Sequence, residues 1–271
     1  MNLQKRLWKV VGFIVFVLLL VACADKSDDV ATETEGNGEQ GMEASLEDTY
    51  TLVTDNSFVP FEFIENDELV GFDIDLIHAI ADEAGFELEV EQTNFDGIIP
   101  GLQTGQFDIA VAGIGITEER KAVIDYSDPY FESGLAIGVR VDNENIEDIE
   151  DLEGKTIATR LGSTSSAYIS EHIEGANASE FEQLDQAYLA VENGSADAVL
   201  YDDPNVRYYI QTQGEDSLKV VGDLYEAEDY GIAITQGKPE LVEAINDALQ
   251  TLRDDGTYDE IYEEWFGATD E

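Results

Sequence analysis

The chain has 271 residues, of which 61 are Asp or Glu and 13 are Lys or Arg, so its formal net charge is −48 at pH 7. This charge excludes nucleic acid as a partner, because a phosphate backbone binds basic surfaces. It also destabilises a compact chain by self-repulsion unless salt screens the charges. The composition therefore indicates an acidic surface of the halophilic or alkaliphilic kind.

The first 23 residues have the pattern of a secretory signal. Basic residues precede an apolar run from Val10 to Val21, which is too short to span a membrane comfortably as a mature helix. The run closes with Leu20-Val21-Ala22-Cys23, which resembles the lipobox of bacterial lipoproteins, where cleavage precedes the cysteine and its sulfur is acylated. We therefore expect residues 1–22 to be a signal peptide. Cys23 should carry a lipid such as palmitate, which anchors the protein outside the cytoplasm to the cell membrane.

Cys23 is the only cysteine, so it can form neither a disulfide within the chain nor a cysteine-based metal site, and this favours lipidation. The alternative is an incidental thiol inside an uncleaved anchor helix. Residues 24–48 lack apolar periodicity, so we expect residues 23–48 to be the lipidated cysteine and a disordered acidic tether. Removing residues 1–22 takes away three basic and no acidic residues, which leaves a formal charge of −51.

The stretch that follows the tether predicts strands alternating with helices. The expected elements are a strand at Tyr50–Val53, a helix in residues 71–85 with Asp73 or Asp75 as N-cap and Gly85 as its stop, a strand at Phe86–Glu91, a helix at Asp96–Gly105, and a buried strand at Phe107–Gly113. This alternation implies parallel pairing, with the loops gathered at the carboxyl edge of one sheet.

A second alternating set predicts a second lobe. Its elements are strands at Leu135–Val139 and Thr156–Arg160, a helix at Ser165–Ile173, a strand near Phe181, a helix at Gln186–Asn193, and a strand at Ala196–Tyr201. Three further elements close the chain: a strand at Tyr230–Thr235, a helix whose first turn holds Pro239, and a helix that opens with a Thr257/Glu260 capping box and buries Ile261, Tyr262, Trp265 and Phe266.

Residues 112–120, AGIGITEER, are the first candidate for binding chemistry. A strand that ends in a glycine-rich loop leaves backbone N–H and C=O groups that need partners, and a small zwitterion supplies them. Arg120 adds a planar, permanently charged fork that suits a carboxylate. In a chain this acidic, Arg120 could equally form a solvated ion pair.

Several long motifs in order resemble the polar amino-acid-binding proteins of ABC importers, and among these most closely the glutamine-binding proteins. The motifs are DNSFVPFEF at 55–63, GFDIDL, NFDGIIPGLQ, AGIGITEERK, YSDPYF, DLEGKTIATRLGSTS, ADAVLYDDPN, YGIAI and LRDDGTYDEIYEEWFG. The resemblance implies an α/β, two-lobed periplasmic-binding-protein-like fold of type II with two crossover strands, near Tyr130–Gly134 and Glu226–Tyr230. Lobe 1 would comprise residues 49–131 and 231–271, and lobe 2 residues 132–230.

The same resemblance implies a function. The chain would be a receptor outside the cytoplasm that delivers a free polar amino acid to an ABC permease, as a monomer, without cofactor, metal or catalysis. Two other classes compete with this hypothesis. One is an enzyme of the cyclohexadienyl-dehydratase kind, which would need a positioned acid or base beyond the groups that hold the amino acid. The other is an extracellular sensor domain.

The resemblance also implies the binding residues. Arg120, Thr164 and Ser165 would hold the ligand α-carboxylate, Asp202 and the Gly113 carbonyl the α-ammonium, Phe58 and Phe95 would flank the side chain, and Asp55 would reach its polar end. The alternative for the two phenylalanines is ordinary core packing.

Three positions depart from the family pattern. Gly115 stands where relatives have a hydroxyl, so that contact would be lost or passed to water or Thr117. Arg160 replaces lysine and Tyr201 replaces histidine near the ligand side chain. Arg160 would repel a cation, which favours glutamine or glutamate over arginine. Glutamine is the best match because its amide can accept from Arg160 and donate to Asp55, although pairing of these two residues would weaken that argument.

Other acidic and histidine residues predict no metal site. The acidic run at 142–148 has calcium-like spacing but lacks a glycine at its sixth position, which favours a surface loop over an EF-hand. His78 and His172 lie on expected helices without paired ligand spacing, so surface or structural roles are expected.

Replacing Cys23 by alanine removes the sulfur that would carry the lipid. The Cys23→Ala protein should therefore appear in the soluble fraction, whereas the parent protein sediments with the membranes. Cell fractionation with immunodetection measures this difference, and unchanged membrane retention of the variant would contradict the lipid anchor.

Overall fold

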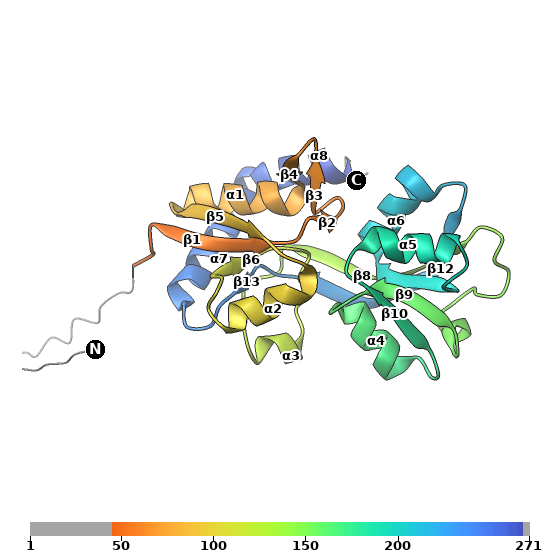
Figure 1. Cartoon of the computed structure of the whole chain (residues 1–271). Coiled ribbons are helices and arrows are strands. Elements are labelled where there is room, and N and C mark those ends of the chain that lie inside the picture. The colour runs from red at the N-terminus through yellow and green to blue at the C-terminus, as the bar shows by residue number, and fades with distance from the viewer. Residues whose placement is uncertain (1–44, 268–271) are drawn as a thin grey trace, which may run out of the picture. The chain divides into compact units, whose positions relative to one another are not determined.

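The structure is a computed structural model that describes residues 45–267 (Figure 1). The signal peptide, Cys23 and nearly all of the expected tether lie outside these residues. Within residues 45–267, no helix is long and apolar enough to cross a membrane.

A five-stranded sheet forms the first lobe. Its strands, in spatial order, are β5 (Glu87–Gln92), β1 (Thr49–Thr54), β6 (Ile109–Ala110), β13 (Ala233–Ile234) and β7 (Asp125–Tyr126). β1 is parallel to β5 and β6, whereas β13 is antiparallel to β6 and β7. Because β13 lies between β6 and β7, two separate stretches of sequence complete this sheet.

Helices cover both faces of the first sheet. They are α1 (Phe72–Ala84), α2 (Phe95–Gln103), α3 (Glu118–Lys121), α7 (Pro239–Asp255) and α8 (Thr257–Phe266). Leu52 belongs to the core shared with α1 and α7, while Val53 belongs to the core shared with α2. Successive side chains of a strand point to opposite faces, so β1 contributes to both cores. A small antiparallel sheet of β2 (Ser57–Phe58), β3 (Glu62–Glu65) and β4 (Glu68–Val70) precedes α1.

The second lobe contains another five-stranded sheet. Its strands, in spatial order, are β10 (Asn177–Phe181), β9 (Thr156–Arg160), β11 (Ala198–Asp202), β8 (Phe131–Arg140) and β12 (Leu218–Tyr230). Its helices are α4 (Thr164–His172), α5 (Leu184–Glu192) and α6 (Asp203–Tyr209), with short helical turns η1 (Glu150–Leu152) and η2 (Ile210–Gly214).

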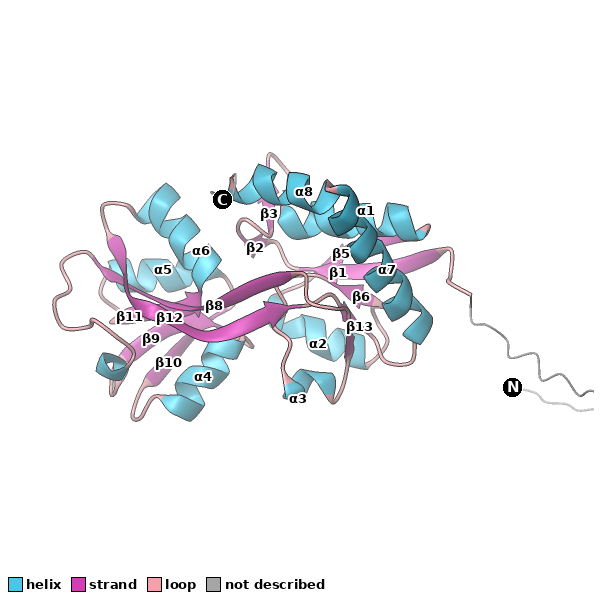
Figure 2. Cartoon of the chain, turned by 180° about the vertical axis from the view of Figure 1, so that it is seen from behind, coloured by secondary structure: helices cyan, strands magenta, loops and turns pink. Residues whose placement is uncertain are grey.

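Two strands connect the lobes. β8 and β12 pair antiparallel from Arg140 and Leu218 to Phe131 and Tyr230, and they cross together from one lobe toward the other (Figure 2). The α/β class, the two lobes and the two crossover strands are therefore confirmed. The exact lobe boundaries remain a prediction.

The predicted N-cap of α1 was wrong. Gly71, rather than Asp73 or Asp75, is the N-cap of α1. Asp73 is fully buried in the first turn, where its Oδ2 accepts from the Gly113 N–H and the Tyr130 hydroxyl, both at 2.8 Å. Gly85 ends α1 in the left-handed conformation, as predicted.

The last helix also begins differently from the prediction. α8 follows α7 through the single left-handed residue Gly256, so Thr257 becomes the first helical residue and makes no capping bond with its side chain. The apolar residues of α8 are half-buried rather than fully buried, and they pack against the core of the first lobe.

Two buried strands are shorter than predicted. The expected strand at Phe107–Gly113 keeps ladder pairing only at Ile109–Ala110, because the chain then bends into the loop around Gly113, whose φ is +52°. The expected strand at Tyr230–Thr235 is divided, since Tyr230 ends β12 and only Ala233–Ile234 form β13.

Gly71 predicts an asymmetric response at the two ends of α1. An added Cβ at Gly71, where φ is +137°, would lie 2.1 Å from the Phe61 carbonyl oxygen, whereas one at Gly85, where φ is +82°, would meet nothing within 4 Å. Gly85→Ala should therefore cost about 1 kcal/mol of backbone strain, and Gly71→Ala several times more because backbone atoms must move. Chemical denaturation of both variants measures this, and equal destabilisation would contradict the close approach at Gly71.

Candidate functional site

Arg120 joins loops of the two lobes. Thr117 caps α3 by accepting from the Arg120 N–H at 3.2 Å. The guanidinium donates from Nη1 to the Gly115 carbonyl at 3.0 Å and from Nη2 to the Gly162 carbonyl at 3.1 Å. Among the described residues Arg120 forms no ion pair within 4.0 Å, so the alternative of a solvated ion pair is not what the structure shows. A pocket of about 890 Å³ is lined by Arg120 and its neighbours in both lobes.

The start of α4 faces this pocket. Ser163 is the N-cap and accepts from the Ser166 N–H at 3.2 Å. Thr164 is the first helical residue and donates its hydroxyl to Glu228 Oε2 at 2.8 Å. Ser165 is fully buried, and its hydroxyl shares hydrogen bonds with Thr159 at 2.8 Å and Ser163 at 2.7 Å. The Ser165 side chain therefore orders the helix start, and only its backbone can serve an anion there.

Asp202 is a buried carboxyl at the end of β11. It is 5% exposed, its Oδ2 accepts from the Tyr230 hydroxyl, and its Oδ1 has no hydrogen-bond partner among the described residues. Burial, with a smaller contribution from the charge of Glu228, raises the pKa of Asp202 to about 8, although Tyr230, Arg120 and Arg160 act to lower it. A cation beside Oδ1 would satisfy this oxygen and return the pKa toward its usual range.

Gly113 lies where only glycine fits. Its φ is +52°, and an added Cβ would lie 2.2 Å from the Phe58 ring. Its N–H donates to the buried Asp73 side chain, and this bond fixes the peptide group between Ala112 and Gly113. Asp73 of α1 therefore fixes the position of the glycine-rich loop.

The two phenylalanines are both core residues and neighbours of the charged groups. Phe58 is buried in β2, stacks on Phe61 at a centroid distance of 4.8 Å and meets Tyr201 edge to face at 5.7 Å. Phe95, the first residue of α2, lies 5.7 Å from the Arg120 guanidinium carbon and 4.8 Å from that of Arg160. An aromatic face attracts such cations, so Phe95 helps to hold both arginines.

Arg160 and Asp55 form a fully buried ion pair between the lobes. Arg160 Nη2 also lies 3.3 Å from the Ser57 hydroxyl, while Nε and Nη1 have no partner among the described residues. Burial lowers the pKa of Arg160, but Tyr201 and Asp55 outweigh this and hold it above the usual range. The expectation that a ligand amide bridges the two residues therefore needs correction, because they already bind each other.

Glu228 was missed by the sequence analysis. Its carboxylate fills the space beside Gly115. Of the three outcomes expected for the hydroxyl contact that Gly115 lacks, which were loss or replacement by water or by Thr117, the structure favours loss. Thr117 is occupied as the cap of α3. Glu228 lies in an acidic stretch of β12 that has the composition of a solvated strand, and only the missing side chain at Gly115 could have suggested a partner.

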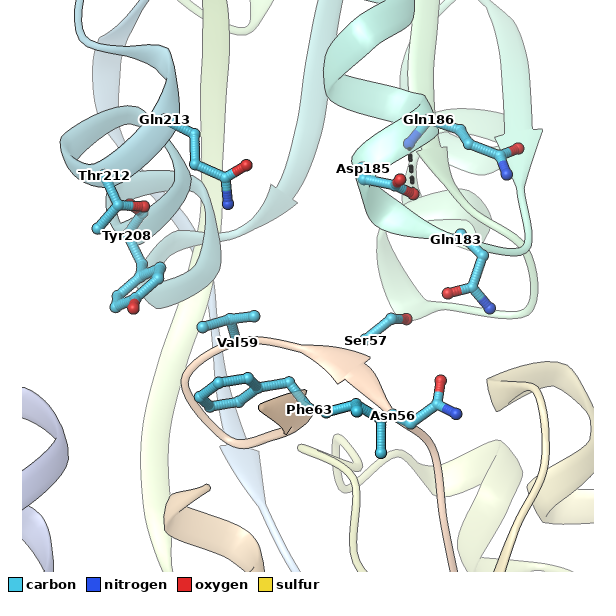
Figure 3. Close-up of a pocket in the computed structure, with 11 residues that line it drawn as sticks. Asn56, Ser57, Val59, Phe63, Gln183, Asp185, Gln186, Tyr208, Thr212 and Gln213 are labelled. Carbon is cyan, nitrogen blue, oxygen red and sulfur yellow. Dashed lines mark hydrogen bonds between the residues drawn. The ribbon is translucent and has the colours of Figure 1, made fainter. Parts of the chain in front are cut away.

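A second hollow, of about 510 Å³, lies between the β2–β3 hairpin and the second lobe (Figure 3). Asn56, Val59 and Phe63 line it from below, and Gln183 and Tyr208 from above. None of the predicted binding residues lines this hollow, so it is separate from the site around Arg120. Among residues 45–267, no group of three or more His, Cys, Asp or Glu side chains could hold a metal ion.

Residues 50–268 match the model of the bacterial extracellular solute-binding proteins, family 3, and the chain belongs to this family. It is an extracytoplasmic, amino-acid-binding protein of ABC transport and not an enzyme. This agrees with the class that the motifs predicted.

Individual relatives differ in the ligand that they are named for. The chain is 35% identical over 265 residues to the ABC transporter glutamine-binding protein GlnH of Bacillus subtilis (strain 168), with 92% of each chain covered. It is 29% identical over 271 residues to a probable histidine-binding protein of Neisseria gonorrhoeae, with 98% of this chain and 97% of the relative covered. A solved ancestral arginine-binding protein bound to glutamine is 43% identical, with a TM-score of 0.78 and coverage of 83% of this chain and 100% of the other.

The raised pKa of Asp202 predicts how the unliganded protein responds to pH. A carboxyl whose pKa is higher in the folded than in the unfolded state stabilises the fold fully below the unfolded value, about 3.9, and this contribution is lost as pH rises toward 8. Asp202→Asn retains the acceptor for Tyr230 but cannot ionise. Its melting temperature should therefore rise relative to the parent between pH 5 and 9.

The melting temperature of the parent is subtracted from that of the variant at each pH, which removes the contribution of the other carboxyls. Asp82→Asn is the matched control, because Asp82 is exposed on α1 and makes no side-chain hydrogen bond or ion pair with the described residues, and it should give a flat difference. A flat difference for Asp202→Asn as well would show that Asp202 is ionised in the folded protein throughout this range.

Proposed function

We propose that this protein binds L-glutamine and presents it to an ABC permease. The buried Arg160–Asp55 pair carries the proposal, because two guanidinium nitrogens of Arg160 have no partner among the described residues. Because Asp55 already balances the charge of Arg160, the end of the site is close to neutral but rich in hydrogen-bond donors. A neutral acceptor such as a side-chain amide oxygen satisfies those donors without adding charge.

Charged side chains fit this end less well. A glutamate carboxylate would bind Arg160 but add a negative charge near Asp55, and an arginine guanidinium would bring donors to a place that already lacks acceptors. The similarity to a glutamine-binding protein and to a solved protein bound to glutamine supports the assignment. Arginine is the second candidate, because an ancestral arginine-binding protein that is 43% identical was solved bound to arginine.

The zwitterionic part of the ligand would lie nearer the crossover strands. Arg120 and the first turn of α4 at Thr164 and Ser165 would bind the α-carboxylate. Asp202 and the Gly113 carbonyl would bind the α-ammonium. Phe58, Phe95 and Tyr201 would enclose the side chain, as would the backbone around Gly115 and Thr117. The unsatisfied Oδ1 of Asp202 supports the ammonium end, since a buried carboxylate oxygen without a donor is costly.

The remaining parts of the proposal follow from the sequence. The protein would act as a monomer, held to the outer side of the membrane by a lipid on Cys23, with residues 24–48 as its tether. A length of 25 residues of flexible chain gives a root-mean-square reach of about 25–30 Å, enough to let the lobes approach a permease in the same membrane.

Titration calorimetry with glutamine, glutamate and arginine tests the proposal. Glutamine should bind tightest, by roughly 1 to 3 kcal/mol for each buried polar group that the other ligands leave unpaired. Arg120→Ala should abolish binding of all three because it removes the partner of the shared α-carboxylate. The control is Arg207→Ala, which removes an arginine that is exposed in α6 and pairs only locally with Asp203.

Two results would overturn parts of the proposal separately. Preference for arginine by the parent protein would refute glutamine as the ligand while leaving amino-acid binding intact. Near-parental affinity of Arg120→Ala for the preferred amino acid would refute the assignment of the carboxylate site.

A further inference from the structure

Glu228 and Gly115 fit each other across the junction of β12 and the glycine-rich loop. Gly115 forms an isolated bridge with Tyr230, and the Ile116 N–H donates to the Asp229 carbonyl at 2.9 Å, so the loop runs alongside the end of β12. A Cβ on Gly115 would fall 1.3 Å from Glu228 Oε1. The absence of a side chain at Gly115 therefore makes the space that the Glu228 carboxylate occupies.

The Glu228 carboxylate lies among the groups of the proposed zwitterion site. Its Oε2 accepts from the hydroxyl of Thr164, the first residue of α4, at 2.8 Å. Burial raises the pKa of Glu228, while Thr164 and Arg120 act to lower it. Glu228 lies two residues before Tyr230 on β12, so the two side chains leave the strand on the same face, and the Tyr230 hydroxyl donates to Asp202. The charge of Glu228 is also the main neighbouring charge that raises the pKa of Asp202.

Two neighbouring carboxyls in a partly buried site call for a cation. Among residues 45–267, Asp202 Oδ1 has no hydrogen-bond partner, and Glu228 accepts a hydrogen bond only at Oε2. A primary ammonium carries a positive charge and three N–H donors, so it can bind both carboxylates and a backbone carbonyl at once. A metal ion would need a third side-chain ligand, and residues 45–267 offer no such group.

We propose that Glu228 is a second carboxylate ligand for the α-ammonium of the bound amino acid, opposite Asp202, in the space that Gly115 leaves open. This inference rests on the proposed function and adds a residue from a crossover strand to the binding site. An ammonium between two carboxylates relieves their repulsion, which gives ligand binding a driving force that a single carboxylate lacks.

An alternative role for the Glu228 carboxylate is to occupy the position of the ligand α-carboxylate when no ligand is bound. The contacts of Arg120 argue against it, because that guanidinium donates to the carbonyls of Gly115 and Gly162 and forms no ion pair with Glu228 within 4.0 Å. The two roles predict opposite effects when the charge of Glu228 is removed. If Glu228 binds the ammonium, the protein should bind the amino acid more weakly. If Glu228 occupies the place of the α-carboxylate, the protein should bind the amino acid more tightly.

The variant Glu228→Gln keeps the shape and the acceptor for Thr164 but removes the charge. Calorimetry with L-glutamine, L-glutamate and L-arginine should show at least tenfold weaker binding of whichever of these the parent binds, because all three share the α-ammonium. 4-Carbamoylbutanoic acid, which is glutamine without its α-amino group, shows whether the loss of affinity depends on the ammonium. The preference of the parent for L-glutamine over this analogue should fall by the same factor in Glu228→Gln.

Glu132→Gln is the matched control, because Glu132 lies on the other crossover strand, β8, is exposed, and does not line the pocket around Arg120. It should change affinity by less than about twofold, and circular dichroism should show all three proteins folded. Unchanged or tighter amino-acid binding by Glu228→Gln would overturn the inference while leaving the proposed function standing. Failure of the parent to bind any of the three amino acids would overturn the proposed function and the inference together.

Discussion

The buried ion pair between Arg160 and Asp55 sets the chemistry of the whole junction between the lobes. Moving two charges out of water costs several kcal/mol for each ion, and their attraction offsets this only when both are well paired. Asp55 meets this condition through Arg160 and through the N–H and hydroxyl of Ser57. Arg160 meets it only in part, since Phe95 covers one face of the guanidinium and two of its nitrogens lack partners among residues 45–267. The lobes therefore close around a group that still has donors to offer.

A further layer of buried carboxyls supports this junction. Glu62 is fully buried near Asp55 and Asp73, and burial raises its pKa well above the usual value, with Asp73 and Asp55 adding to the effect. Burial raises the pKa of Asp73 to about 7, against the opposing effects of Gly113 and Tyr130. A neutral carboxyl among charged ones can donate as well as accept. The acidic composition thus reaches into the core, where it orders the glycine-rich loop.

Sequence patterns predicted the elements with strong periodicity and missed the contacts made between distant segments. β9 begins and ends where the pattern placed it, and α7 has Pro239 in its first turn, as expected. Asp73 looked like a helix cap because its short side chain near a helix start is typical of one, but a hydrogen bond to Gly113, 40 residues away, determines its position. The role of Glu228 could not be predicted, because it depends on the absence of a side chain at Gly115. The pairing of Asp55 with Arg160 joins residues 105 apart, and only the closed lobes bring them together.

The position of β13 affects the order in which the chain can fold. The second sheet uses only residues 131–230, so all its strands are present before the C-terminal segment is synthesised. The first sheet lacks a strand between β6 and β7 until Ala233 and Ile234 are synthesised. The face that α1 covers stays partly exposed until α7 is synthesised. A chain made from its N-terminus therefore completes its second lobe first. Chaperones that meet this chain during synthesis or export would find an exposed apolar surface on the part that emerged earliest.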